Sequence, residues 1–215
     1  MIDKWKLTKF VGTKFDKNDL VNSTLCVYLG TWELGYPQPE KDFGYMSVTY
    51  DTSDYCVDCG VGAVQKSPFR IKKQPQWGKK SMFDLNWVID EIFVNRKIYK
   101  DVFEKFGIEK LPVLLLKDNE ELDDTFQLKI PQIDIALDLK AHPYEVCKTC
   151  GRMKYDPQIK GYFPGFKGST GAFSMFKSRE YFGSGHQAFH RIFISKELIS
   201  AISKFGPRPS LAPVG

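Results

Sequence analysis

Two stretches of the chain share one hydrophobic pattern, in which a short apolar run is followed by apolar residues at helical spacing. The first covers residues 92–107 and the second residues 192–206, which is one residue shorter. In each stretch the apolar run predicts a strand, Asn95 or Ser195 supplies an N-cap, and a glycine ends an amphipathic helix. The apolar face consists of Ile98, Val102 and Phe106 in the first helix and of Leu198, Ile202 and Phe205 in the second.

Elsewhere the pattern favours strands over helices. Residues 111–117 form an apolar run that predicts a buried strand, and Ile133, Ile135, Leu137 and Leu139 alternate with polar or small residues as in a half-buried strand. Strand-like stretches cover residues 25–29 and 45–50, with a loop broken by Pro37 and Pro39 between them. Residues 152–179 predict turns and short strands, and the tail 207–215 predicts an irregular or extended segment. These elements predict an α+β fold with few helices.

Length and composition are those of an ordinary globular protein. The chain has 215 residues, of which 42% are hydrophobic and 27% charged, and this balance argues against disordered and membrane proteins. There is no apolar run of about 18 residues, and the N-terminus lacks the features of a signal peptide. We therefore expect a single interdigitated domain over residues 1–215, a cytoplasmic location and no membrane partner.

The net charge of +5 is mild but unevenly distributed. Residues 66–80 carry six basic side chains and no acidic one, whereas residues 118–124 are rich in Asp and Glu. Such runs are typical of solvated loops, and the alternative is a surface for a protein or nucleic-acid partner.

Four of the five cysteines occur in two identical frames, because residues 56–60 and 147–151 both read Cys-x-x-Cys-Gly. Each frame brings two thiolates to one point, and the glycine permits the positive φ that turns backbone amides toward the sulfurs. Two such turns supply the four soft ligands that tetrahedral zinc prefers. The sequence therefore predicts one structural zinc ion per chain, held by Cys56, Cys59, Cys147 and Cys150.

Other interpretations of these cysteines remain open. Two disulfides or two redox pairs would also use Cys-x-x-Cys, although a reducing cytosol disfavours disulfides and neither frame opens a thioredoxin-like unit. His142, near the second frame, could replace one thiolate. Four cysteine ligands leave no position for a catalytic water, which argues against zinc hydrolysis. Cys26 is predicted to be a buried core thiol.

Each Cys-x-x-Cys-Gly frame precedes its own strand–helix pattern, so the chain has two halves of the same order. They cover about residues 56–117 and 147–206. We interpret them as an internal duplication whose halves are joined by the zinc site. A chance match of two apolar helix patterns is the alternative.

The sequence lacks the common catalytic signatures. It contains no dinucleotide-binding glycine motif, no phosphate loop and no nucleophile elbow. Residues 183–186, followed by His190, are better explained as a turn before the second strand than as a catalytic group. Residues 155–182 interleave aromatic and basic side chains, a combination found both in single-strand nucleic-acid binders and in β-rich cores. The mild net charge favours the core.

The doubled Cys-x-x-Cys-Gly and the strand–helix unit of residues 92–107 resemble the bacterial double-CXXCG motif proteins. The stretch Val94-Asn95-Arg96 matches the family's strand end, with Asn where the family has Ser, and Arg152 follows the second frame as in the family. The resemblance covers residues 56–206 and leaves the first fifty residues unmatched. It implies a non-enzymatic protein with zinc as a scaffold, because some members are regarded as immunity proteins that neutralise a toxin.

The leading expectation is thus a zinc-binding immunity protein whose partner is a cognate bacterial toxin. One alternative is a zinc-containing nucleic-acid-binding or regulatory module that uses residues 66–80. A further alternative is a thiol redox protein that acts through its Cys pairs.

Overall fold

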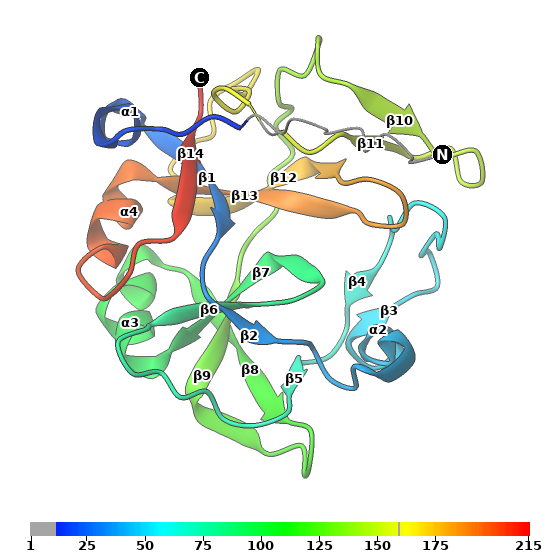
Figure 1. Cartoon of the computed structure of the whole chain (residues 1–215), viewed down its shortest axis with the longest axis vertical. Coiled ribbons are helices and arrows are strands. Elements are labelled where there is room, and N and C mark those ends of the chain that lie inside the picture. The colour runs from blue at the N-terminus through cyan, green and yellow to red at the C-terminus, as the bar shows by residue number, and fades with distance from the viewer. Residues whose placement is uncertain (1–11, 159) are drawn as a thin grey trace, which may run out of the picture.

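The computed structural model describes residues 12–158 and 160–215 (Figure 1). Residues 1–11 and residue 159 lie outside the described residues. The prediction that the N-terminus carries no signal peptide concerns residues 1–11 and therefore also falls outside them. Helices are short. They are α1 (Lys17–Asn22), η1 (Lys41–Phe43), α2 (Tyr45–Thr49), α3 (Arg96–Asp101), η2 (Phe103–Phe106) and α4 (Lys196–Ile202).

Within the described residues the strands form two six-stranded sheets and one two-stranded pair. Sheet A has the order β10 (Tyr144–Val146), β11 (Met153–Tyr155), β12 (Met175–Phe182), β13 (Phe189–Ser195), β1 (Leu25–Gly30) and β14 (Ser210–Pro213). Sheet B has the order β2 (Glu33–Gly35), β6 (Met82–Leu85), β7 (Val88–Asn95), β9 (Glu121–Lys129), β8 (Glu109–Leu115) and β5 (Arg70–Ile71). The pair consists of β3 (Tyr50–Asp51) and β4 (Val64–Gln65). The molecule is therefore a strand-rich mixed fold with two curled sheets.

Both predicted strand–helix units are present, as β7–α3 and β13–α4. The side chain of Asn95 accepts a hydrogen bond from the Ile98 amide at 2.9 Å, and the Ser195 hydroxyl accepts one from the Leu198 amide at 3.3 Å. Each cap satisfies an amide that the first turn of a helix leaves free. The first helix is shorter than predicted, because α3 ends at Asp101 and the chain tightens into η2.

The two units are alike beyond the predicted strand and helix. Each begins with the sequence Ser-Met-Phe, at residues 81–83 where β6 begins and at residues 174–176 where β12 begins. Phe83 pairs with Phe93 and Phe176 pairs with Phe193 across their hairpins. The rings stack in both hairpins, with centroids 5.0 Å and 5.5 Å apart. This Ser-Met-Phe segment with its stacked Phe pair is a third shared feature, in addition to the predicted strand and capped helix.

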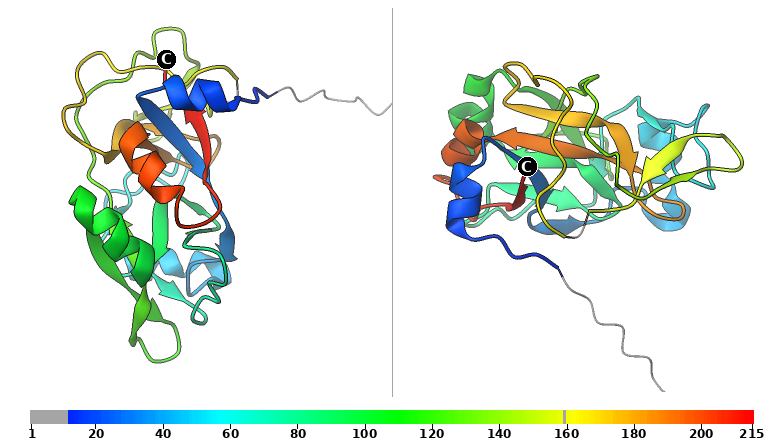
Figure 2. Two further views of the ribbon diagram at one scale, coloured as in Figure 1. Left: turned by 90° about the vertical axis from the view of Figure 1, so that its left-hand side faces the viewer. Right: turned by 90° about the horizontal axis from the view of Figure 1, so that it is seen from above.

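Alternate residues of the two units are buried in different cores. Phe93 packs in a cluster on one face of sheet B, and Phe193 packs in a separate cluster on sheet A. Helices α3 and α4 lie side by side (Figure 2), and a third cluster joins them to both sheets. That shared core contains Ile92, Val94, Ile98 and Val102 from the first unit and Ile192, Ile194, Leu198 and Ile202 from the second.

Predictions for the remaining segments had mixed outcomes. Strands were confirmed at β1 and at β8, which begins two residues before the predicted stretch, and Cys26 is fully buried. The strand-like stretch 45–50 is mostly the helix α2, so that prediction was wrong. The helical turn of α2 places the side chain of Tyr45 in the core of sheet B.

One further prediction was wrong and another was incomplete. Residues 133–139 form no ladder and make only an isolated bridge between Leu137 and Phe166, although Ile133, Leu137 and Leu139 are buried as the alternation implied. Within the tail 207–215, predicted to be irregular or extended, residues 210–213 are extended and form β14, whose pairing with β1 at the edge of sheet A was not predicted. An alternation of apolar and polar residues indicates that one side of a segment is buried. Whether the segment forms a strand depends on a pairing partner far along the chain.

Candidate metal centre

The structure brings the four predicted cysteines together. The Sγ atoms of Cys56, Cys59, Cys147 and Cys150 all lie within 4.8 Å of one another. Cys56 and Cys147 approach to 3.8 Å, and Cys59 and Cys150 approach to 3.6 Å. Four sulfurs at about 2.3 Å from one zinc ion in a tetrahedron lie about 3.8 Å apart. The cluster therefore fits one metal ion in size and in donor type. All four cysteines are free thiols and form no disulfide.

Both Cys-x-x-Cys-Gly turns have the same backbone geometry. The amide of Gly60 donates to the carbonyl of Cys56 at 2.8 Å, and the amide of Gly151 donates to the carbonyl of Cys147 at 2.8 Å. The amide of each leading cysteine also donates to the carbonyl five residues later, at 2.9 Å in both turns. The glycines have φ of 80° and 72°, as predicted from their place in the frame. Each turn is thus closed by its own hydrogen bonds before any metal is considered.

The two turns differ in what surrounds them. A Cβ atom at Gly60 would overlap the carbonyl oxygen of His186, in the loop between β12 and β13, whereas one at Gly151 would meet open space. Cys56 and Cys59 are buried, and Cys147 and Cys150 are less so. The first turn is therefore packed against sheet A, and the second closes over it from the β10–β11 hairpin, on the right of the molecule in Figure 1.

Two basic side chains support the turns from within. Lys154, only 1% exposed, donates to the carbonyls of Cys59 at 3.0 Å and Gln187 at 3.1 Å, and also bonds the carbonyl of Gly185. Arg152 donates to the carbonyl of Val61 at 3.2 Å and pairs with Asp54. A divalent ion with four thiolates carries a net charge of about −2, which nearby cations stabilise.

The environment acts on the thiols unequally. Burial raises the pKa of Cys59 to about 12, so in the absence of metal this thiol keeps its proton. The backbone amides of Cys150 and Thr149 lower the pKa of Cys147 to about 7, because they stabilise the thiolate. At neutral pH Cys147 therefore loses its proton, and becomes a metal ligand, more readily than Cys59.

The histidines lie outside the sulfur cluster and contact backbone oxygens. The Nε2 atom of His142 lies 2.7 Å from the carbonyl of Asp156, so His142 does not replace a cysteine ligand. The predicted turn at residues 183–186 is present between β12 and β13. From it, the Nδ1 atom of His186 lies 2.9 Å from the carbonyl of Val57 in the first Cys turn. His190 makes a similar contact with the Glu180 carbonyl.

The other candidate features have structural roles. In the basic run, Arg70 bonds Asn119 and Lys80 lies 3.5 Å from the ring centroid of Trp32, while the remaining lysines are exposed. Part of the acidic run, from Glu121 onward, belongs to β9 and not to a loop. The aromatic residues of 155–182 mostly serve the core, since Phe163, Phe176 and Phe182 are buried.

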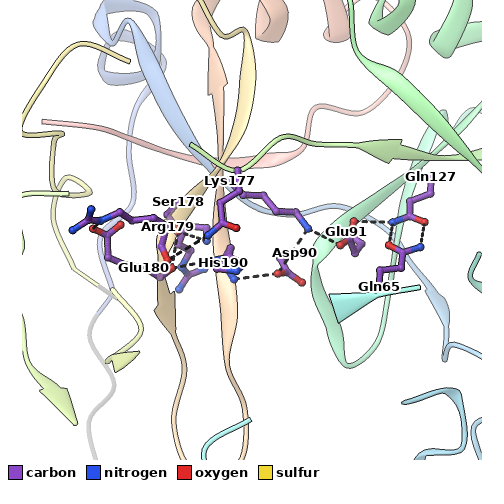
Figure 3. Close-up of polar contacts among 11 residues, drawn as sticks. Gln65, Asp90, Glu91, Gln127, Lys177, Ser178, Arg179, Glu180 and His190 are labelled. Carbon is purple, nitrogen blue, oxygen red and sulfur yellow. Dashed lines mark hydrogen bonds and ion pairs between the residues drawn. The ribbon is translucent and has the colours of Figure 1, made fainter. Parts of the chain in front are cut away.

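A polar network that the sequence analysis did not single out connects the two sheets. Lys177 of β12 pairs with Glu91 of β7 at 2.5 Å and lies 3.9 Å from Asp90 (Figure 3). Glu91 also accepts a hydrogen bond from Gln127 at 2.9 Å, and Gln127 bonds Gln65. Burial raises the pKa of Glu91. These residues are far apart in sequence, and none carries a motif.

Comparison of the chain with protein-family models, with curated proteins and with solved structures finds no match. The resemblance to the double-CXXCG proteins therefore rests on its motifs. Among the helices of the described residues, none has the length and apolar character needed to cross a bilayer.

Proposed function

We propose that the four cysteines hold a structural zinc ion and that the protein is a non-enzymatic immunity protein. In this proposal it acts in the cytoplasm, where it binds and neutralises a cognate bacterial toxin. The observation that carries the structural role is the cluster itself, in which four sulfurs surround one point. A zinc ion with four protein ligands has no open position for water or substrate, so its contribution is to the fold.

The immunity role is supported by the family resemblance of the two Cys-x-x-Cys-Gly turns and of the β7–α3 unit with its Asn95 cap. The nucleic-acid alternative has less support. Three of the aromatic side chains that would stack on bases, Phe163, Phe176 and Phe182, are buried in the core of sheet A.

We also infer that the two halves arose by duplication. Support comes from the shared Ser-Met-Phe strand, the stacked Phe pairs, the side-chain caps of both helices and the matching hydrogen bonds of the two Cys turns. A chance match of apolar patterns would not extend to the hydrogen bonds of the metal turns. The metal site then lies where one turn from each half meets the other.

Growth rescue tests the immunity role directly. The toxin domain of each toxin-like gene found next to this one is expressed alone, with the wild-type chain, and with the variant Cys147→Ser/Cys150→Ser. We expect the wild-type chain to restore growth and to co-purify with the toxin, and we expect the variant to fail because its binding surface is no longer held in shape.

The matched control is Cys26→Ala, which removes a thiol outside the cluster and should rescue growth. Absence of a toxin-like gene beside this one, or failure of the wild-type chain to rescue growth or to bind the toxin domain, would contradict the immunity role. Salt-dependent binding of RNA or DNA by the wild-type protein would favour the nucleic-acid alternative.

A further inference from the structure

A cavity of about 810 Å³ lies between the two sheets, beside the metal centre. Its walls come from the β6–β7 turn, from the segment that includes η1 and α2, and from the loop between β12 and β13. Gly60 and Gly62 of the first Cys turn form part of one wall. Cavities of about 300–1,000 Å³ are the size that binds small molecules.

Aromatic side chains dominate the lining of this cavity. Six of them are Phe43, Tyr45, Tyr50, Tyr55, Trp87 and Tyr181. The hydroxyl groups of the four tyrosines make no hydrogen bond with another residue in the described part of the chain, so they are available to a ligand. Among the described residues that line the cavity there are two aspartates, Asp42 and Asp90, and neither Lys nor Arg.

The charge balance at the cavity wall is negative. Lys177, which is not part of the lining, is closest to Glu91, at 2.5 Å against 3.9 Å to Asp90 (Figure 3). Asp90 and Glu91 therefore share one ammonium group, which lies closer to Glu91. Asp90 also accepts a hydrogen bond from the His190 amide at 3.1 Å. Burial lowers the pKa of His190, which keeps its ring neutral at pH 7.

Backbone strain is concentrated at the mouth of the cavity. Asp42, Phe43 and Trp87 have φ of 52°, 54° and 68°, in the left-handed region that bulky side chains rarely adopt. Phe43 is nevertheless 56% exposed and Trp87 39% exposed, and their ring centroids lie 4.5 Å apart. Such strain is found where function requires a side chain at a given place. The ring of Trp87 also packs on Tyr36, with centroids 4.4 Å apart, so the aromatic residues hold one another in place at the cavity.

We propose that this cavity binds a small organic cation, namely a substituted ammonium group on an apolar or aromatic body. Ring faces attract a cation within about 6 Å of their centroids, and quaternary ammonium groups bind in cages of this kind. Asp90 and Asp42 add an attraction, because the described lining carries two carboxylates and no Lys or Arg, and Lys177 behind it is shared between Asp90 and Glu91. The apolar body of the ligand fills the remaining volume. The proposal is independent of the toxin and of the immunity role.

Calorimetry on the zinc-loaded, full-length protein tests the charge requirement. The probes are benzyltrimethylammonium, choline and the neutral isostere of choline, 3,3-dimethyl-1-butanol. We expect one binding site per chain, and choline at least ten times tighter than its neutral isostere. Absence of binding by both cations at millimolar concentration would overturn the proposal, as would equal affinity for choline and the isostere.

Two variants locate the binding in this cavity. Asp90→Asn keeps an acceptor for the His190 amide but removes the charge, and we expect it to weaken cation binding at least tenfold. Phe43→Gly places a glycine at φ 54°, so it should fold as well as the wild type and weaken binding at least fivefold. Phe43→Gly decides the question even if Asp90→Asn fails to fold.

The matched controls carry the same changes outside the cavity. Asp134→Asn alters an exposed carboxylate that pairs with Arg179, and Phe173→Gly removes a ring that is 49% exposed. Both should bind the cations as the wild type does. Unchanged binding in Phe43→Gly, or equal loss in Phe173→Gly, would place the binding elsewhere and contradict the proposal.

Discussion

Lys154 shows how much of the metal centre depends on one side chain outside the sulfur cluster. From β11 it reaches the carbonyl of Cys59 in the first Cys turn, two carbonyls of the β12–β13 loop, and the Glu145 carboxylate at 3.0 Å. A buried ammonium has three donors, and here protein oxygens occupy all of them. The first Cys turn, the loop and the β10–β11 hairpin are therefore held at one point.

Replacement of this lysine should be costly. We expect Lys154→Met to lower the free energy of unfolding by about 2–4 kcal/mol, because buried carbonyls lose their donor while the methionine fits the same space. Urea denaturation followed by fluorescence measures the change. Lys167→Met, at an exposed position, is the control and should alter stability by less than about 0.5 kcal/mol. A similar small effect for both variants would show that the carbonyls find other donors.

Asp84 gives the stability of the protein a pH dependence opposite in sign to that of a carboxylate in an ion pair. Burial raises the pKa of this carboxyl to about 6, although it accepts hydrogen bonds from the Tyr28 hydroxyl at 2.6 Å and from the Thr31 amide at 2.7 Å. Between about pH 4 and pH 6 the folded protein therefore binds more protons at this site than the unfolded chain does. The contribution of Asp84 to stability is largest below this window and is lost as the pH rises through it.

The variant Asp84→Asn isolates this contribution. We expect the difference in unfolding free energy between wild type and variant to change by on the order of 2 kcal/mol from pH 4 to pH 6.5, in the direction that weakens the wild type at the higher pH. Denaturation at several pH values measures it. A difference that stays constant, or that grows in favour of the wild type as the pH rises, would refute the raised pKa.

At the scale of elements, the sequence predicted what short-range chemistry decides. The strand–helix units were found because an apolar run, a capping side chain and a helical apolar face lie within about fifteen residues of one another. The Cys turns were found for the same reason, since ligand spacing and a glycine with positive φ are local properties. Their meeting across 87 intervening residues was inferred from coordination chemistry.

Elements that depend on distant partners were not predictable in this way. The tail forms β14 because β1 offers it an edge, and nothing within residues 207–215 signals that edge. The helix α2 arises in a stretch of β-prone residues, because Tyr45 is buried by packing on sheet B. The cavity is the extreme case: Trp87 and Asp90 come from the β6–β7 hairpin of sheet B and Tyr181 comes from β12 of sheet A, and only the packing of both sheets brings the two sets together.

At the scale of the whole molecule, the metal centre joins parts that the sheets do not join directly. One turn lies between β3 and β4 of the two-stranded pair, and the other lies between β10 and β11 of sheet A. Elsewhere the sheets meet through the shared core around α3 and α4 and through the Lys177–Glu91 ion pair. Loss of the metal should therefore loosen the side of the molecule that contains the cavity and leave the helical side packed.

Metal analysis tests this arrangement. We expect about one zinc ion per purified chain, and none in Cys147→Ser/Cys150→Ser. Removal by a chelator should lower the melting temperature by at least roughly 10 °C, because the four-sulfur site contributes to folding. The exchange rates of backbone amides should rise most around the two Cys turns. Cys26→Ala should keep its zinc, and a metal-free wild-type protein with unchanged melting temperature would exclude a structural metal.

The place of β1 in sheet A has a consequence for biosynthesis. This strand is translated more than 150 residues before its neighbours β13 and β14, with Cys26 opposite Ile194 on one side and Pro213 on the other. Until those last strands have been translated, β1 has two unpaired edges, and pairing over so long a separation is slow. The nascent chain can therefore complete sheet A only after β13 and β14 have been translated, and during that interval a chaperone has a defined strand to protect.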